Sequence, residues 1–497
     1  MKTLFFLLLL ALSASAHIGS PNVFYEGHAG PHAVRVVIRP PAALPGMAQV
    51  DVRVSDSAIT GVTVRPAFVE AGSGAAAEPV PALAAAGDAH LFHATCWLLR
   101  RGNYAVLITL QTVIGTSSVE VPLQAASLVP PTMSPALAST LGALGLLLFA
   151  AAAALAGAAA REAALPADTL PSLGDIRRGR RASALALVVL GSALAAGAGR
   201  WWKMDADFRA NALFRPTPVL AAVQPSGLLR ITPTADAAWD SVVTDHGKLM
   251  HCFLVREPSG DAFAHLHPVR RDATTFETLL PPLPAGKYTL YGEITHDTGT
   301  DETLLATVQL PATTMPPQRG WTMLGDALCM APSALVDDAP APTALDFDDS
   351  WHIAETAANA SECPLPGGYL MVFETPGELL ADRDTALRFA VFDAAGKGAP
   401  IQPYMGMAGH AVIRRRDGSV FTHLHPAGTI SMAAQQLLTL REKEPLSAPP
   451  AAADAGNEIL YPYAFPTPGE YRIWVQTRIA GRVHTGVFDV VVKPQPQ

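Results

Sequence analysis

Cysteine, charge and basic residues are all scarce in this sequence of 497 residues. Its 4 cysteines are too few for a disulfide scaffold. Only 16% of the residues are charged, and 43 acidic residues outnumber 35 basic ones, which gives a net charge of −8. This balance argues against nucleic acid as a partner. The sequence also shows no acid/base pair, nucleophile triad or cofactor loop, so it predicts no catalytic residues.

The first 16 residues have the pattern of a secretory signal peptide. Met1-Lys2 is followed by a short apolar run and then by small residues up to Ala16. Cleavage after Ala16 would leave His17 as the amino terminus, where its α-amine and imidazole could chelate one copper ion together. The alternative is that cleavage merely happens to precede a histidine.

Two further apolar stretches are long enough to cross a bilayer. Residues 136–160 contain no charge, and residues 182–199 form a shorter run rich in alanine and glycine. Arginine predominates in the loop between them, 161–181, which we therefore expect in the cytoplasm. The helices would anchor the chain in a bacterial inner membrane, with both outer parts on the periplasmic side.

The rest of the chain is expected to form β-structure. Runs rich in β-branched and aromatic residues alternate with proline and glycine turns in three segments, 17–130, 214–312 and 366–497. Each segment has the length and turn spacing of an immunoglobulin-like sandwich. We therefore expect a mainly β protein with three immunoglobulin-like β-sandwich domains, two transmembrane helices and a linker at 313–365.

The last two segments share a repeated histidine pattern. His-Leu-His-Pro occurs at 265–268 and at 423–426, each time with another histidine upstream and a polar turn between them. This arrangement is typical of a β-hairpin. A second match, Ala285 to Tyr288 with Pro468 to Tyr471, supports a duplicated domain. The later copy carries an insert, 430–456, whose first residues, 432–441, predict a short helix.

The strand period of two predicts where these histidines lie. If Asp417-Gly418 form the turn, His410 lies opposite His425, and His423 shares their face. The first copy follows the same rule with a wider turn. Three ring nitrogens on one face could reach a common metal ion. The predicted triads are His251, His265 and His267 in the first copy, and His410, His423 and His425 in the second.

Nearby ligands indicate which metal each triad would bind. Met405 and Met407 precede the second triad, and thioether with imidazole favours copper, Cu(I) especially. The first copy offers Met250, His246 and His296 instead, which predicts weaker binding, zinc, or a purely structural role. We therefore predict a copper site in the second copy, with zinc as the alternative metal.

Two smaller features lie in or near the linker. Cys329 and Cys363 could form a disulfide in an oxidising compartment, whereas Cys96 and Cys252 are expected to be buried and unpaired. The stretch Asp346 to Asp349 could bind calcium, although acidic loops of this kind are usually only solvated.

Residues 407–412 and 417–426 together resemble the motif of the YtkA-like domains, small extracytoplasmic β-sandwiches associated in bacteria with copper handling. The first copy is similar to a looser version, because it lacks the Met-Gly-Met sequence before its first histidine. The amino-terminal segment resembles only a generic immunoglobulin-like or CopC-like sandwich. The resemblance implies a periplasmic, copper-associated domain without a defined reaction.

Three functions are compatible with these patterns. The first is a membrane-anchored extracytoplasmic protein that buffers, delivers or senses copper, with the second triad as ligands and Met405 or Met407 as a soft axial partner. The second is a non-catalytic envelope scaffold that holds another envelope protein and uses its histidines structurally. The third is a copper oxidase built around His17.

Overall fold

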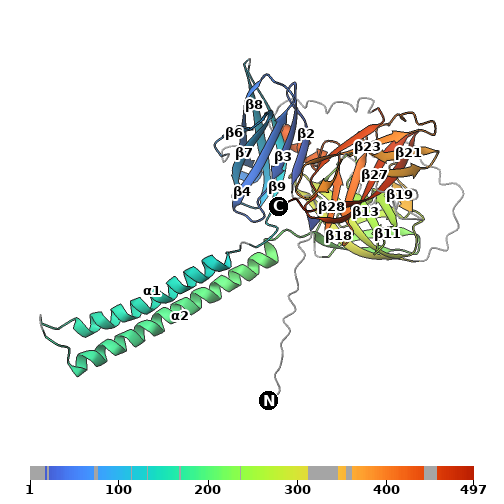
Figure 1. Cartoon of the computed structure of the whole chain (residues 1–497). Helices are drawn as coiled ribbons and strands as arrows, with labels where there is room; N and C mark the ends of the chain where they lie inside the picture. The colour runs from blue at the N-terminus through green and yellow to red at the C-terminus, as the bar shows by residue number, and fades with distance from the viewer. Residues whose placement is uncertain are drawn as a thin grey trace. The chain divides into compact units, whose positions relative to one another are not determined.

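In the computed structural model the chain is mainly β, with two long helices and one short α-helix among the described residues. The structure describes residues 17–18, 22–71, 77–113, 115–130, 132–166, 169–234, 237–311, 345–353, 361–375, 377–441 and 456–496. The predicted signal peptide, 1–16, and most of the predicted linker lie outside these residues. The chain divides into a β-rich unit and a helical unit, 126–214, which Figure 1 shows and which we describe separately.

An eight-stranded sheet, in the order β2-β3-β4-β7-β6-β5-β8-β9, forms the amino-terminal part of the β-rich unit. Its strands alternate between buried and exposed residues, as in β4, where Val50, Val52 and Val54 join one apolar core. The elements are β2 Val23–Ala29, β3 His32–Arg39, β4 Gly46–Val54, β5 Ile59–Phe68, the 3-10 helix η1 Val69–Ala71, β6 Val80–Ala85, β7 Asp88–Leu98, β8 Gly102–Thr112 and β9 Gly115–Ala125.

The first histidine repeat lies in a ten-stranded sheet, in the order β15-β16-β11-β10-β18-β17-β13-β14-β19, with β12 paired to β17. We call this the middle sheet. Its strands are β10 Thr217–Val223, β11 Leu228–Pro233, β12 Val242–Val243, β13 His251–Arg256, β14 Ala262–Leu266, β15 Val269–Asp272, β16 Thr275–Leu279, β17 Gly286–His296, β18 Asp301–Leu310 and β19 Ser350–Ile353.

The second repeat lies in a six-stranded sheet, β1-β25-β24-β27-β28-β22, which shares an apolar core with a four-stranded sheet, β20-β21-β23-β26. The elements are β1 His17–Ile18, β20 Glu362–Leu365, β21 Tyr369–Phe373, β22 Leu379–Leu380, β23 Thr385–Phe392, β24 His410–Arg415, β25 Val420–Leu424, α3 Met432–Arg441, β26 Glu458–Tyr463, β27 Gly469–Ile479 and β28 Arg482–Lys493. The predicted helix in the insert is therefore confirmed as α3.

A tyrosine corner, in which a tyrosine hydroxyl bonds to a backbone carbonyl just upstream, occurs in all three β segments. Tyr104, Tyr288 and Tyr471 each lie two residues after a glycine with φ between +136° and +148°. Each phenol donates a hydrogen bond to the carbonyl four residues upstream, at 3.2, 2.8 and 2.7 Å respectively. Glycine is needed because a side chain is rarely tolerated at such angles. The matching residues 285–288 and 468–471 form the second and third corners, and in the first corner only the glycine and the tyrosine match.

The middle sheet and the six-stranded sheet pack together through the strands that carry the two repeats. Strands β13, β14 and β17 meet β24, β25 and β27 in a shared apolar cluster. Within it, Phe263 stacks on Trp474 at 4.8 Å and Tyr291 stacks on Phe421 at 3.8 Å between ring centroids. The contact is reciprocal, because each repeat presents the same face of corresponding strands, as in a two-fold dimer.

The helical unit is a hairpin of α1, Pro135–Glu162, and α2, Leu173–Asn211 (Figure 1). Both helices are long and apolar enough to cross a membrane. They approach closely at Gly157, where a Cβ would lie 2.0 Å from the Ser183 Oγ atom. The predicted loop 161–181 is shorter than expected, because α2 begins at Leu173, where Ser172 and Asp175 form a capping box. Its arginines therefore lie largely on the first turns of α2.

Gly428, just after the second histidine motif, packs against the backbone of the amino-terminal sheet. Replacing it should destabilise the β-rich unit. Gly428 has φ +122°, and a Cβ there would lie 1.9 Å from the Phe24 carbonyl oxygen. We expect Gly428→Ala to lower the free energy of unfolding by about 3 kcal/mol, because a backbone clash adds to the backbone strain. The measurement is urea unfolding of the full chain in detergent, followed by tryptophan fluorescence.

The matched control is Gly87→Ala, since Gly87 has φ +84° and open space where its Cβ would lie. It should lose only about 1 kcal/mol, the cost of the backbone angle alone. Equal losses in the two variants would show that the contact with Phe24 does not constrain the chain.

Candidate metal centre

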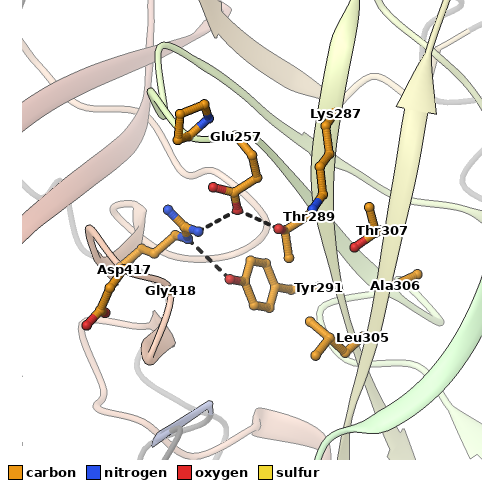
Figure 2. Close-up of a pocket in the computed structure, with 11 residues that line it drawn as sticks. Glu257, Lys287, Thr289, Tyr291, Leu305, Ala306, Thr307, Asp417 and Gly418 are labelled. Atoms are coloured by element: carbon orange, nitrogen blue, oxygen red, sulfur yellow. Dashed lines mark hydrogen bonds and ion pairs between the residues drawn. The ribbon is translucent and has the colours of Figure 1, made fainter. Parts of the chain in front are cut away.

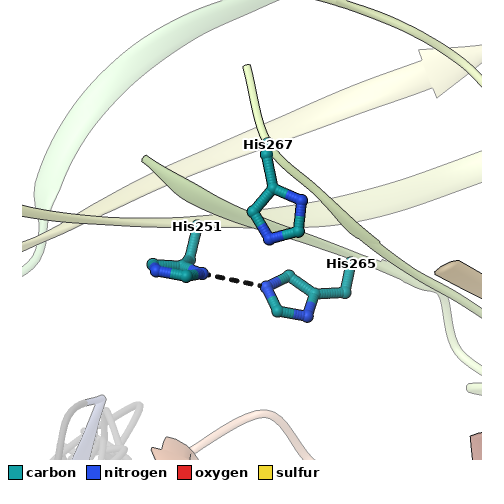
Figure 3. A group of neighbouring side chains, drawn as sticks. All are labelled: His251, His265 and His267. Carbon is teal, nitrogen blue, oxygen red and sulfur yellow. Dashed lines mark hydrogen bonds between the residues drawn. The ribbon is translucent and has the colours of Figure 1, made fainter. Parts of the chain in front are cut away.

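The predicted hairpin register is confirmed in both repeats. Strand β24 pairs with β25 so that Val412 faces His423, and β13 pairs with β14 so that Cys252 faces Leu266. Period two then places each upstream histidine opposite the last histidine of its motif. Within each triad, nitrogen atoms of all three imidazoles lie within 4.8 Å of one another. Figure 3 shows this convergence for His251, His265 and His267.

The two triads face each other across the sheet interface, which the sequence analysis did not foresee. The ring centroids of His251 and His423 lie 5.3 Å apart, and those of His265 and His423 lie 5.6 Å apart. A seventh imidazole, that of His246, lies 4.8 Å from His425. We call these seven residues the histidine centre: His246, His251, His265, His267, His410, His423 and His425.

Each triad has its middle histidine oriented by the opposite repeat. The Gln476 Oε1 atom lies 2.8 Å from His265 Nδ1, and the Glu293 Oε2 atom lies 3.0 Å from His423 Nδ1. Glu293 and Gln476 are equivalent residues, since Glu293 pairs with His251 and Gln476 pairs with His410. Both lie five residues after the repeated tyrosine, a spacing by which the sequence could have identified them.

These contacts set the tautomers of the first triad. The Gln476 amide nitrogen donates to Ser350, so its oxygen accepts the Nδ1–H of His265. His265 Nε2 then accepts from His251 Nδ1 at 3.1 Å, which leaves the lone pair of His251 on Nε2. His267 Nδ1 donates to the Asp349 carboxylate at 3.0 Å, which likewise leaves its lone pair on Nε2.

The second triad follows the same scheme. His423 bonds through Nδ1 to Glu293, and its Nε2 atom accepts from His410 Nδ1 at 3.2 Å. His425 Nδ1 donates to the Ile430 carbonyl at 3.2 Å. The free lone pairs of His410 and His425 are therefore on Nε2, as in the first triad.

The most unusual feature of this site is that buried Nε2 atoms of the histidines lack a hydrogen-bond partner. Within the described part of the chain, buried Nε2 atoms without a hydrogen-bond partner occur in His246, His251, His267, His410 and His425. A buried polar atom without a partner costs about 1–3 kcal/mol. Five in one cluster would cost as much as the net stability of many domains. A metal ion is a partner that accepts lone pairs from several such nitrogens together.

Burial keeps most of these imidazoles neutral. Desolvation, followed by the charges of neighbouring histidines, holds the pKa of His251, His265, His410 and His423 well below the usual value. The same burial lowers the pKa of His425 to about 3. Neutral imidazole is the form that ligates a metal, so no deprotonation has to precede binding at neutral pH.

Carboxyl groups border the histidine centre on one side. Burial and the nearby charges of Asp301 and Asp245 raise the pKa of Glu293 to about 8, and burial raises that of Asp301 to about 6. Burial also raises the pKa of Asp245, whose Oδ1 atom accepts from the Ala433 N–H at 2.9 Å at the start of α3. A cation in the histidine centre would favour the ionised form of these acids.

The acidic stretch Asp346 to Asp349 contacts this centre, and its carboxylates bond to neighbouring residues. Asp349 accepts from both the backbone N–H and the ring of His267. Asp348 pairs with Lys248 at 3.0 Å and with Arg478 at 2.5 Å. The stretch therefore orients a predicted ligand, a role the sequence analysis did not assign to it.

Met405 is buried and Met407 half-buried, both in the turn before the second triad. Met250 is buried in the separate core of the middle sheet, and His296 bonds to Glu302 and Ser241, so neither belongs to the histidine centre. The ligand roles of the two turn methionines remain predictions.

The amino-terminal copper site at His17 remains a prediction. The backbone of His17 pairs with Val420 in β1, and no group of three metal-binding side chains occurs among the described residues of the amino-terminal sheet. Two other histidines of this sheet bond to carboxylates, His32 to Asp56 at 2.8 Å and His93 to Asp51 at 2.6 Å.

The cysteine predictions have mixed outcomes. Cys96 and Cys252 are buried and free, as expected. Cys363 is also a free, buried thiol, which accepts from the Val487 N–H at 3.3 Å. Its expected disulfide partner, Cys329, lies outside the described residues.

A pocket of about 440 Å³ opens along the same interface (Figure 2). The Arg414 guanidinium spans it, bonding to Glu257 at 2.5 Å and to the Tyr291 hydroxyl at 3.2 Å. Glu257 also accepts from Thr289 at 2.5 Å. The polar groups in this pocket satisfy one another across the two repeats, so they fix how the sheets align.

Comparison with known proteins adds little to this geometry. A family described as a domain of unknown function, DUF8832, matches residues 367–494, well under half of the chain. No curated protein matches the sequence.

Solved structures show only remote likeness. The fibronectin(III)-like modules of CbhA from Clostridium thermocellum are 8% identical over 56% of this chain and 94% of theirs, with a TM-score of 0.12. Latent PorU from Porphyromonas gingivalis is 9% identical over 96% of this chain and 34% of its own, with a TM-score of 0.13. An α2-macroglobulin from Escherichia coli is 9% identical over 98% and 24%, with a TM-score of 0.17. None of these supports a functional argument.

Glu293 and Gln476 orient His423 and His265. Exchanging their side chains tests how a buried carboxyl affects the stability of the metal-free centre. Glu293→Gln keeps an oxygen for His423 and removes a carboxyl that is only 26% exposed. We expect a gain of about 1 kcal/mol in unfolding free energy at pH 8, measured with a chelator present. Because the folded state raises this pKa from 4.5 to about 8, the gain should shrink as the pH falls from 8 towards 4.5.

The mirror variant Gln476→Glu introduces a carboxyl at a position with 0% exposure. It should lose stability at pH 8 and recover part of it in acid. Differences that do not change with pH would contradict the assigned burial of the carboxyls.

Proposed function

We propose that this chain is a membrane-anchored protein that binds copper outside the cytoplasm through the histidine centre, in order to buffer, deliver or sense it. The observation that carries the proposal is the set of five buried Nε2 atoms without a protein partner. Their lone pairs lie among neutral imidazoles, and the carboxyl groups beside them can balance the charge of a cation.

Copper is favoured by the donor set. Imidazole binds Zn²⁺ and both copper states, whereas a thioether nearby shifts preference towards Cu(I). Met405 is the buried thioether of the turn before the second triad. Zinc is the alternative metal. If the centre bound zinc and Cu(I) with equal affinity, the nearby methionine would give no reason to prefer copper.

The two apolar helices support a membrane anchor. A hairpin of two spans places the chain before α1 and the chain after α2 on one side of the bilayer. Arginines gather at the connected ends of the helices, and Trp201, Trp202 and Lys203 lie near the other end of α2. This pattern, with the signal-like start of the chain, supports a cytoplasmic hairpin turn and periplasmic β segments.

The repeated tyrosine corner supports three immunoglobulin-like sandwiches. Such a corner, with a phenol bonded to a carbonyl a few residues upstream, is a feature of immunoglobulin domains. The confirmed hairpin register of the two histidine repeats is compatible with the YtkA-like resemblance, which we retain as a proposal. On this view residues 214–312 and 366–497 are two related domains that pack through their histidine faces.

A scaffold without metal is the alternative, favoured by the low exposure of the histidines, 0–6% for the six triad members. In that case the imidazoles serve only to hold the two repeats together. Metal binding by the purified protein separates the two functions.

The test is Cu(I) titration of the full chain in detergent under reducing conditions, against a competing chelator. The wild-type chain should bind copper and gain unfolding free energy, by about 2.7 kcal/mol at a free copper concentration of 100 times Kd. The double variant His423→Ala/His425→Ala should bind less copper and show a smaller gain.

The matched control is His28→Ala/His90→Ala, which removes two exposed histidines of the amino-terminal sheet and should bind like the wild type. Tryptophan fluorescence of each metal-free variant establishes that it is folded. A folded wild-type chain that binds neither copper nor zinc would overturn the proposal in favour of the scaffold.

A further inference from the structure

We propose that the histidine centre holds two ions, one in each triad, and that each ion takes its fourth ligand from the opposite repeat: Met405 for the first triad and His246 for the second. This inference rests on the proposed metal binding and adds the number of ions, their different chemistry and the crossed ligands.

Donor spacing supports one ion in each triad. A tetrahedral ion with bonds of 2.0–2.1 Å separates its ligand atoms by roughly 3.3 Å. Within each triad, one ring nitrogen of each histidine lies within 4.8 Å of a ring nitrogen of the other two. Among the described residues, no group of three such metal-binding side chains combines histidines of both triads. The donors therefore form two groups and not one.

The turns that precede the triads are equivalent in the two repeats. His246-Gly247 has φ values of +52° and +78°, and Met405-Gly406 has +49° and +78°. In both turns the flanking residues exchange two backbone hydrogen bonds, Asp245 with Lys248 and Tyr404 with Met407. Two consecutive residues with positive φ define a type I′ turn. His246 and Met405 therefore occupy the same position in corresponding turns.

His246 crosses to the opposite triad. Its ring lies 4.8 Å from His425 and 5.3 Å from His410, but 6.2 Å from His251 of its own repeat. Asp245 beside it bonds to the start of α3, in the segment that also supplies the Ile430 carbonyl to His425. The turn at His246-Gly247 is thus hydrogen-bonded to the segment that holds His425 of the second triad.

Met405 is placed to cross in the other direction. The hydroxyl of the preceding residue, Tyr404, donates to the Asp348 carbonyl at 2.8 Å. Asp349, the next residue along, holds His267 of the first triad. The turn at Met405-Gly406 is therefore hydrogen-bonded to the segment that holds His267 of the first triad, which mirrors the contact of the first turn. This assignment moves Met405 from the adjacent triad to the distant one.

Crossed ligands make the two sites chemically different. Three imidazoles with a thioether favour Cu(I) at the first triad, whereas four imidazoles at the second bind Zn²⁺ and both copper states. The first repeat, which lacks its own methionine turn, becomes the softer site. A Cu(I) ion and a harder ion could then be held side by side.

Single-triad variants test the number of ions. The full chain in detergent should bind two Cu(I) ions, and His267→Phe and His425→Phe should each bind one. Phenylalanine fills the space of the imidazole, and tryptophan fluorescence of the metal-free variants checks their folding. A wild-type chain that binds a single ion, lost in either variant, would overturn the two-ion inference and leave metal binding intact; a chain that binds none would overturn both.

Double variants test the crossing. In the His425→Phe background, where only the first site remains, Met405→Leu should weaken Cu(I) binding about tenfold or more, and His246→Leu should not. In the His267→Phe background the effects should exchange. Met407→Leu, in the same turn, is the control and should change neither site. If Met405→Leu weakens only the second site, the methionine serves its own repeat and the crossed assignment is wrong.

Discussion

The structure depends on the face-to-face packing of two related β-hairpins, which removes seven imidazoles from water together. Aromatic stacking at one part of this interface, such as Tyr291 on Phe421 at 3.8 Å, offsets the cost of burying polar rings beside it. Neither hairpin alone could exclude solvent from its triad, because each presents its histidines on an outer sheet face. The low exposure of the histidines, the lowered pKa values of His251, His265, His410, His423 and His425, and the five unpaired Nε2 atoms all follow from this one contact.

The two repeats retain the same backbone plan while their ligand shells differ. Glu293 in one corresponds to Gln476 in the other, and His246 corresponds to Met405. Glu293 differs from Gln476 in charge, and Met405 is a softer metal ligand than His246, while the backbone is the same in both repeats. A symmetric interface therefore contains two different environments. The segments that cover the triads differ more. Strand β19 pairs beside β14, whereas α3 and its preceding loop follow β25 along the chain.

The amino-terminal sheet reinforces the second triad through short backbone contacts. The Glu26 N–H donates to the Ala427 carbonyl at 2.8 Å, and Gln435 of α3 bonds to the Glu120 carbonyl at the same distance. The loop that supplies the Ile430 carbonyl to His425 is therefore held from both sides. Ile430 itself packs into the amino-terminal core, which gives a further contact between this sheet and the segment that holds His425.

The sequence by itself determined the hairpins, their register and the membership of each triad, because strand periodicity and turn chemistry are local properties. It also predicted α3 and the buried Cys96 and Cys252. Only the tertiary structure decided that the triads share one interface, that Glu293 and Gln476 orient histidines of the opposite repeat, and that Asp349 holds His267. These contacts join residues up to 211 positions apart, and no local pattern encodes which faces of two separate sheets will pack together.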